Sequence, residues 1–206
     1  MNTKSLALII TFSAIAIVSN AIRIPAIFYP GTYYGISQVP IVIAFLLFGT
    51  QIGVLVAVLN AAGALALFPL GPSSVIVYPM EFVSVLIMFA GLFVASRRVS
   101  LNGESERVPF WKKPVVGLTA FAVLFRGGIM PFIDYGVIHH VLAPLVFGYG
   151  VPEAYIIGLM PFSVLYNVTV PLYVVPIAYV VATGVGRYLK KELPFLRKVR
   201  DLRARS

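Results

Sequence analysis

Residues 39–67 read VPIVIAFLLFGTQIGVLVAVLNAAGALAL, an uncharged run of 29 residues broken near its middle by Phe48-Gly49-Thr50-Gln51. A helix needs about 20 apolar residues to cross the ~30 Å hydrocarbon core of a bilayer. The run is therefore too long for one crossing and too short for two. We predict a short helix over residues 39–48, a tight turn, and a longer helix over residues 51–68.

The rest of the chain has the same apolar character. Of its 206 residues 60% are hydrophobic and 11% are charged, and the mean hydropathy is +0.96. Soluble domains contain about 45–50% apolar residues. The composition predicts an all-α integral membrane protein whose single membrane domain occupies residues 1–206. Cysteine is absent, which excludes disulfides and thiolate metal sites.

Further apolar runs extend this pattern to six transmembrane helices, at approximately residues 4–25, 39–48, 51–68, 75–95, 114–132 and 161–187, before a basic tail at 188–206. An earlier start of the last helix, at Ala154, stays open. The depth of a further helix between residues 135 and 147 is left open. The first 22 residues also fit a signal peptide, but they continue into Arg23 without a small-residue cleavage site. We interpret them as a retained first helix.

Lysine and arginine are distributed unevenly along the chain. Fourteen of the sixteen are Lys4, five residues between Arg97 and Lys113, and eight between Arg187 and Arg205. Six spans place all fourteen on one side, which the positive-inside rule identifies as cytoplasmic. We therefore expect a multi-pass protein of the plasma membrane with both termini in the cytoplasm. The net charge of +9 then reflects topology and contact with anionic lipid, and nucleic acid is not an expected partner.

Four polar side chains are expected at one depth of the outer leaflet. Counting a rise of 1.5 Å per residue from the outer helix ends, Glu81 and Arg126 lie at ~9 Å, Asn167 at ~10 Å and Asn60 at ~12 Å. A charge within a span costs at least ~2.5–3.5 kcal/mol, so Glu81 and Arg126 should face the bundle interior and each other. This layer either holds the helices together through polar contacts or forms the floor of an outward-opening binding cavity.

Loops on the outer side supply walls for such a cavity, because residues 23–38, 69–74 and 133–153 are rich in aromatic, glycine, proline and uncharged polar residues. The predicted substrate-binding residues are Glu81, Arg126, Asn60, Asn167, Tyr166, Tyr33, Tyr34, Gln38, Tyr78 and His139, with Asp134 and His140 beside them. Adjacent histidines diverge by about 100° on a helix and do not jointly ligate a metal. No metal and no cofactor is expected.

Catalytic and ATP-binding motifs are missing from the sequence. It contains no G-x-x-x-x-G-K-[ST], H-E-x-x-H or G-x-S-x-G pattern. We expect no enzymatic activity, and any transport would take its energy from a partner. Ala7, Thr11, Ala14, Val18 and Ala21 form a stripe of mostly small residues on the first helix. Such a stripe fits close approach of a partner helix, and equally packing within this bundle.

Two stretches carry a resemblance to a known family. Residues 37–72, SQVPIVIAFLLFGTQIGVLVAVLNAAGALALFPLGP, resemble the substrate-binding (S) components of energy-coupling factor (ECF) vitamin transporters, in which a polar-x-Pro entry leads into a short helix ending in a Phe-Gly turn. Residues 161–181, PFSVLYNVTVPLYVVPIAYVV, are similar to the Pro-Phe-Asn start of helix 6 in the riboflavin-type members.

The resemblance implies a protein that binds a vitamin or related small solute from outside. It also implies partners, namely a transmembrane coupling subunit and two ATPase subunits, with docking through Ala7, Thr11 and Ala14. Several positions depart from the riboflavin-type pattern and argue against riboflavin itself: Ser163 in place of Asn, Tyr166 and Asn60 in place of Lys, and Gln38 in place of an acid.

Two other functions stay open on the sequence. A structural or assembly subunit of a membrane complex would use the polar layer only to hold its helices together. An intramembrane enzyme would use Glu81, Asp134 and a histidine.

Overall fold

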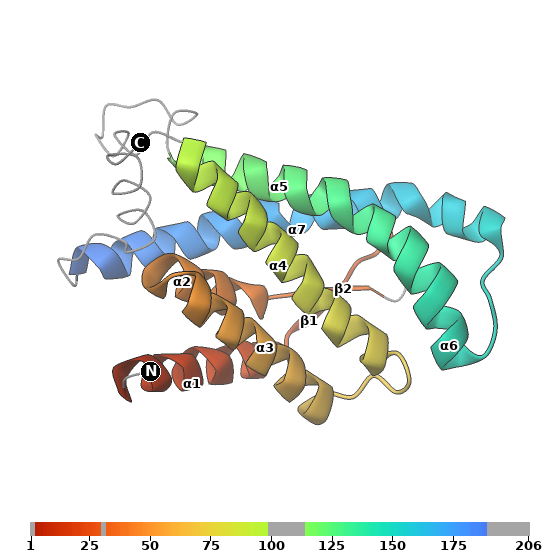
Figure 1. Cartoon of the computed structure of the whole chain (residues 1–206), viewed down its shortest axis with the longest axis horizontal. Coiled ribbons are helices and arrows are strands. Elements are labelled where there is room, and N and C mark those ends of the chain that lie inside the picture. The colour runs from red at the N-terminus through yellow and green to blue at the C-terminus, as the bar shows by residue number, and fades with distance from the viewer. Residues whose placement is uncertain (1–2, 30–31, 99–113, 189–206) are drawn as a thin grey trace.

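The computed structural model describes residues 3–29, 32–98 and 114–188, which form a helical bundle with one small hairpin (Figure 1). The helices are α1 (Thr3–Ser19), α2 (Gln38–Phe48), α3 (Thr50–Leu67), α4 (Ser74–Arg98), α5 (Pro114–Ile133), the π-helix η3 (Asp134–Leu142), α6 (Ala143–Phe147) and α7 (Glu153–Tyr188). Strands β1 (Arg23–Pro25) and β2 (Tyr33–Gly35) pair antiparallel, with Ile24 opposite Tyr34.

Four helical segments are long and apolar enough to cross a membrane: Thr50–Leu67, Gly71–Arg97, Pro114–Phe147 and Glu153–Gly186. The apolar helices α1 and α2 are shorter, with 17 and 11 residues. The chain is therefore an α-helical protein with four candidate membrane spans within its described residues. The six crossings expected from the sequence stay a prediction, because α1 and α2 are too short to qualify by length alone.

Helix α2 forms the centre of the bundle, where Gln38 to Leu47 are all buried. It ends at Gly49, whose φ of 91° is readily adopted only by a residue without a Cβ. The chain then reverses into α3, and the two helices pack at backbone distance, since a Cβ on Gly53 would lie 2.7 Å from that of Phe45. On its other side, the ring of Phe45 stacks on Phe89 of α4 with centroids 4.1 Å apart.

Three element boundaries differ from those expected. α1 ends at Ser19 rather than near Pro25, because Ser19 Oγ and Asn20 Nδ2 bond the carbonyls of its last turn and the chain then enters β1. α7 begins at Glu153, one residue before the earlier of the two starts considered, and contains Pro161, the later one. Residues 134–142 continue α5 as a π-helix just after Pro131, whose missing N–H loosens the helical ladder.

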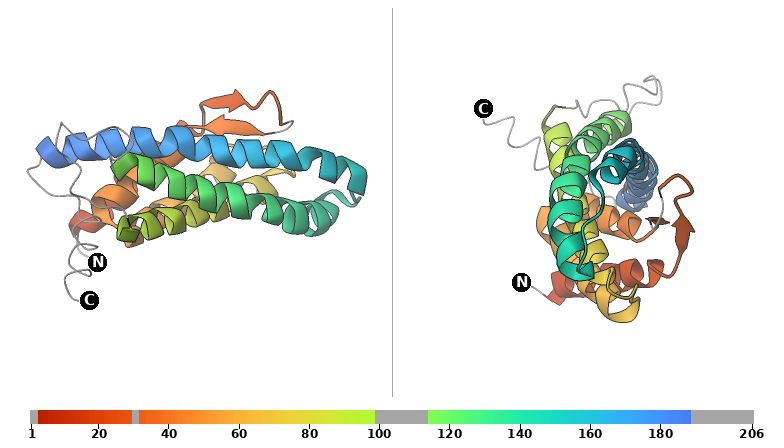
Figure 2. Two further views of the ribbon diagram at one scale, coloured as in Figure 1. Left: turned by 90° about the horizontal axis from the view of Figure 1, so that it is seen from above. Right: turned by 90° about the vertical axis from the view of Figure 1, so that its right-hand side faces the viewer.

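The elements divide between two ends of the bundle. The start of α1, the α2–α3 turn, the end of α4 and the end of α7 lie at one end, on the left in Figure 1, and the α3–α4 loop and α6 lie at the other. Lys4 and Arg97 therefore belong to the same end of the molecule. The hairpin lies outside the helices, beside α7 (Figure 2). Tyr173 of α7 holds it by donating from its hydroxyl to the carbonyl of Gly35 at 2.9 Å.

Candidate functional site

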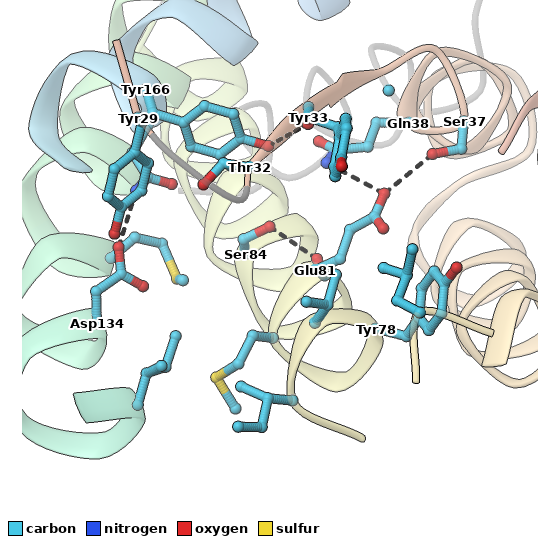
Figure 3. A pocket seen from close by; sticks show the side chains of 18 of the residues that line it. Tyr29, Thr32, Tyr33, Ser37, Gln38, Tyr78, Glu81, Ser84, Asp134 and Tyr166 are labelled. Atoms are coloured by element: carbon cyan, nitrogen blue, oxygen red, sulfur yellow. Dashed lines mark hydrogen bonds between the residues drawn. The ribbon is translucent and has the colours of Figure 1, made fainter. Parts of the chain in front are cut away.

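A cavity of about 240 Å³ opens between the hairpin, the first turns of α2 and α4, the end of α5, η3 and α7 (Figure 3). Its polar lining comprises Asn20, Arg23, Tyr29, Thr32, Tyr33, Ser37, Gln38, Tyr78, Glu81, Ser84, Arg126, Asp134, His139, Tyr166 and Asn167. Apolar walls come from Leu70, Ile76, Val77, Met80, Met130 and Ile138. The cavity therefore joins elements that are far apart in the sequence.

Most of the predicted substrate-binding residues line this cavity. They are Glu81, Arg126, Asn167, Tyr166, Tyr33, Gln38, Tyr78 and His139. Asn60 and Tyr34 are not among the lining residues. These residues line one space of a size that suits a small molecule. Their contact with a solute stays a prediction.

Arg126 of α5 is the central charge of the site and is only 2% exposed. Its Nη1 donates to Oε1 of Gln38 at 2.5 Å, and its Nε donates to Oδ1 of Asn167 at 3.2 Å. Within the described ranges, no carboxylate oxygen lies within the 4.0 Å of an ion pair with this guanidinium. The bonds that hold Arg126 therefore come from two neutral amides.

Glu81 of α4 lies on the other side of the Gln38 side chain. Its Oε1 accepts hydrogen bonds from Ser37 Oγ at 3.0 Å and from Gln38 Nε2 at 3.4 Å (Figure 3). The expectation that Glu81 and Arg126 face each other directly is thus wrong. The physical reason is that an amide has an acceptor at one end and donors at the other, so Gln38 serves both charges at once.

Asp134 extends the same network toward η3. It is buried, and its Oδ2 accepts hydrogen bonds from Ser163 Oγ and, at 3.3 Å, from Asn167 Nδ2. Asn167 thus bridges Arg126 and Asp134 just as Gln38 bridges Arg126 and Glu81. The result is one continuous polar chain across the bundle: Ser37, Glu81, Gln38, Arg126, Asn167, Asp134 and Ser163.

Asn60 and Tyr34 have other partners. Asn60 of α3 is buried and accepts a hydrogen bond at 2.8 Å from Nδ2 of Asn20, which lies just after α1. The Tyr34 hydroxyl lies 2.8 Å from Thr169 Oγ1 of α7, beside a second, apolar cavity. Depth along a helix did not predict the partner of Asn60, because depth does not say toward which neighbour a side chain is rotated. Tyr34 was selected from an outer loop, and the alternation of side chains along β2 decides which way it points.

Tyrosines surround the polar chain. Tyr166 donates to the carbonyl of Tyr33 at 2.9 Å, and its ring lies 6.1 Å from that of Tyr29. Tyr78 donates to the carbonyl of Phe68 and accepts from Arg23 Nη2 at 2.6 Å. Burial raises the pKa of Tyr29 to about 12, so its phenol remains a neutral hydrogen-bonding group at physiological pH.

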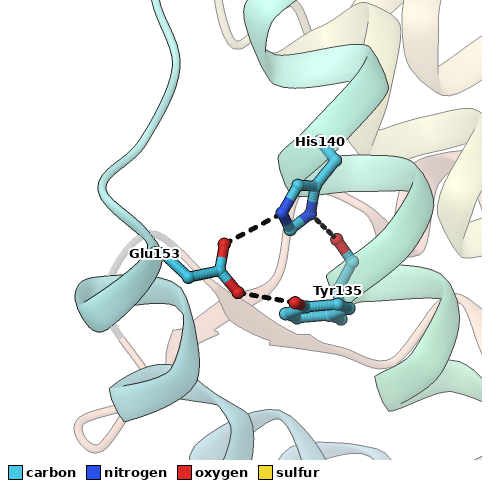
Figure 4. Close-up of polar contacts among 3 residues, drawn as sticks. All are labelled: Tyr135, His140 and Glu153. Atoms are coloured by element: carbon cyan, nitrogen blue, oxygen red, sulfur yellow. Dashed lines mark hydrogen bonds and ion pairs between the residues drawn. The ribbon is translucent and has the colours of Figure 1, made fainter.

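The two histidines of the sequence lie in different surroundings. His139 lines the cavity, whereas His140 is exposed and makes contacts with Tyr135 and Glu153 (Figure 4). Nε2 of His140 lies 3.0 Å from Glu153 Oε2, and the Tyr135 hydroxyl donates to Glu153 Oε1 at 2.5 Å. This cluster ties η3 to the start of α7. Within the described ranges, no three His, Cys, Asp or Glu side chains gather as a metal site requires.

Sequence reasoning missed several lining residues, among them Asn20, Arg23, Tyr29, Ser37 and Ser84. Arg23 could have been selected, because it and Arg126 are the two basic residues outside the clusters that are predicted to be cytoplasmic. Asn20 interrupts an apolar helix end and also could have been found. Tyr29 could not, because its contact with the cavity depends on how the hairpin folds over the helices.

The small-residue stripe on α1 faces away from the bundle. Ala7, Thr11 and Ala14 are exposed, while Ile9, Ser13 and Ala16 on the opposite side of the helix are buried. Packing within this bundle therefore does not account for the stripe.

Neither a protein-family model nor a curated protein matches this chain. A solved structure does: an S component of a bacterial ECF transporter superposes with a TM-score of 0.62 and 21% sequence identity. The match covers 93% of this chain and 100% of the other. At this level of identity the similarity establishes the fold, so the chain has the fold of an ECF transporter S component, a class of membrane transport protein.

Proposed function

We propose that this chain is the S component of an ECF-type transporter, which binds a vitamin or related small solute from outside for ATP-driven uptake by partner subunits. The observation that carries the proposal is the cavity itself. Charged and amide side chains from five helices, α2, α4, α5, η3 and α7, converge on it inside a fold that an S component shares.

The alternative is that the polar layer only holds the helices together and binds no solute. Side chains that only hold helices together bond to one another and fill the space between them. Here the polar chain instead borders about 240 Å³ of open space with tyrosine walls. Pockets with a few convergent polar groups and apolar or aromatic walls are the usual architecture of small-molecule sites.

The proposed membrane arrangement has six crossings with cytoplasmic termini. α1 is about 26 Å long at 1.5 Å per residue, which is close to the hydrocarbon thickness, and α2 is about 17 Å long and continues into α3. The location of Lys4 and Arg97 at one end of the bundle supports this orientation, with the cavity toward the opposite end. In the proposed complex, the exposed Ala7, Thr11 and Ala14 dock onto a transmembrane coupling subunit that two ATPase subunits drive.

Ligand content of the purified protein tests the proposal. The intact chain in detergent is denatured, the released small molecules are identified by mass spectrometry, and the empty protein is screened by thermal shift against a vitamin panel. Thr119→Val serves as a control, because Thr119 lies on α5 outside the cavity, and among the described residues its hydroxyl bonds only the carbonyl of Val115. Absence of any released molecule together with absence of any shift contradicts the proposal.

A second candidate function is an assembly subunit without a ligand. It is favoured by the two hydrogen bonds through which the amides of Gln38 and Asn167 join α2 and α7 to Arg126 of α5. An assembly subunit would show no ligand but would copurify with a stable membrane partner.

A further inference from the structure

The guanidinium of Arg126 has unused donors at the cavity. An arginine side chain carries five N–H donors, and among the described residues only Gln38 and Asn167 accept from it, one bond each. Both acceptors are neutral, and the side chain is 98% buried, being 2% exposed. Buried cations are normally paired with an anion, because desolvation otherwise costs several kcal/mol. Within the described part of the chain, Arg126 therefore faces the cavity as a cation without an adjacent counter-ion.

Glu81 presents the opposite charge to the same cavity. Within the described ranges its bonds from Ser37 and Gln38 both go to Oε1, which leaves Oε2 without a protein donor. Gln38 lies between Arg126 and Glu81 and bonds both, which keeps the two charges apart. The cavity wall therefore carries a positive and a negative group on either side of one amide.

From this arrangement we propose that the solute is dipolar, with a carboxylate that binds the free guanidinium donors of Arg126 and an N–H group that donates to Glu81. The inference rests on the proposed function and specifies its substrate class. The planar fork of an arginine matches the two oxygens of a carboxylate. The second arginine in the wall, Arg23, is only partly buried and already donates three bonds, to Tyr78, Phe68 and Asn20. Arg126 is therefore the buried guanidinium and the one with more donors left for a carboxylate.

The cavity also limits the rest of the solute. Its volume of about 240 Å³ is below the 300–1,000 Å³ typical of sites for drug-sized ligands. The rings of Tyr29 and Tyr166 provide flat walls between the hairpin and α7. A compact solute with one ring, carrying its carboxylate and its N–H group at separate positions, fits these walls and charges.

Matched probes test the two charges separately. The intact protein in detergent is measured by thermal shift and by calorimetric titration with three matched sets of probes. The first set is phenylalanine, phenylalaninamide and phenylpropanoate. The second is para-aminobenzoate and para-aminobenzamide, and the third is biotin and biotinamide. The amides remove the anionic group, and phenylpropanoate removes the ammonium group. We expect the acids with an N–H group to bind at least about tenfold more tightly than their partners, the equivalent of one charged hydrogen bond. The molecule released from the purified protein should likewise contain both groups.

Variants assign the effect to the two residues. Arg126→Gln should abolish the preference for acid over amide, and Glu81→Gln should abolish the preference for the N–H group, while Thr119→Val should change neither. Because a buried arginine can be essential for folding, Gln38→Glu is the second variant. It keeps Arg126 bonded and supplies an internal carboxylate, which should weaken the acids at least about tenfold more than it weakens the amides.

The outcomes distinguish the inference from the proposed function. A bound or released molecule that lacks an anionic group, or equal binding of acids and amides, overturns the inference and leaves the binding function in place. If no molecule is released and no probe shifts the protein, the proposed function is contradicted and the inference falls with it.

Discussion

Nη1 of Arg126 donates a hydrogen bond to Oε1 of Gln38 at 2.5 Å, which joins α5 to the first turn of α2 across 88 positions of the sequence. The other end of the Gln38 amide donates to Glu81 of α4. A single neutral side chain thus connects the cation and the carboxylate of the cavity wall.

Gln38→Leu should destabilise the protein more than any surface change. Leucine has a similar volume to glutamine. Without the amide, however, Arg126, which is buried, and Glu81 each lose one hydrogen bond. We expect a loss of about 2–4 kcal/mol in the free energy of unfolding, measured by denaturant titration in mixed micelles. Thr119→Val, which removes only a hydroxyl bond within α5, should cost less than about 1 kcal/mol. Equal costs for the two variants would show that Gln38 does not support the charges.

Energetic coupling between Arg126 and Glu81 should depend on Gln38. Residues in one hydrogen-bond network show interaction energies of about 0.5–3 kcal/mol in a double-mutant cycle. We expect the cycle of Arg126→Gln and Glu81→Gln to give such a value with Gln38 present and to fall below about 0.5 kcal/mol in the Gln38→Leu background. Coupling that survives without Gln38 would indicate a direct charge interaction instead.

The proposed topology predicts which positions react with a membrane-impermeant thiol reagent. The chain has no cysteine, so a single introduced cysteine reports without background. Ser73→Cys, in the loop before α4, should react from outside intact cells. Thr3→Cys, at the exposed start of α1, should react only after permeabilisation. The reverse pattern would invert the orientation.

We expect the exposed stripe of α1, formed by Ala7, Thr11 and Ala14, to bind the coupling subunit. Replacing Ala7 and Ala14 by Trp adds bulk where close helix approach is required, which should abolish copurification with the coupling subunit. Ligand binding should persist, because both positions lie outside the cavity lining. Leu6→Trp is a matched control, since Leu6 is exposed on α1 but outside the stripe. Loss of ligand binding in the stripe variant would instead mean that these positions support the fold.

Tyr29 should make the protein sensitive to alkali. Its pKa is raised from 10.0 to about 12 by burial, so the unfolded chain loses this proton at lower pH than the folded protein does. Stability from this group is therefore fully present below pH ~10 and is lost as the pH rises toward ~12. Tyr29→Phe should reduce the fall in unfolding free energy between pH ~9 and ~11 by up to about 1 kcal/mol. An unchanged pH dependence in the variant would contradict a buried phenol at this position.

Local properties of the sequence determined the class of the protein. Runs of apolar residues require helices in a membrane, and Gly49 divides residues 39–67 into two helices because its backbone adopts a positive φ. Charge in an apolar helix must face an interior, so Arg126 and Glu81 could be selected as candidates without coordinates. Both line the cavity, together with six of the other eight candidate residues.

Only the tertiary structure decided how those residues are connected. The helices are apolar on nearly all sides, so periodicity carries little information about which face turns inward. A hydrogen bond needs its donor and acceptor within a few tenths of an ångström of their preferred separation of about 2.9 Å, and helix rotation and tilt set that separation. Hence Gln38 rather than Glu81 bonds Arg126, Asn60 bonds Asn20, and Tyr34 turns to α7. The sequence therefore determined which polar side chains lie at this depth, and the tertiary structure determines which partners they bond.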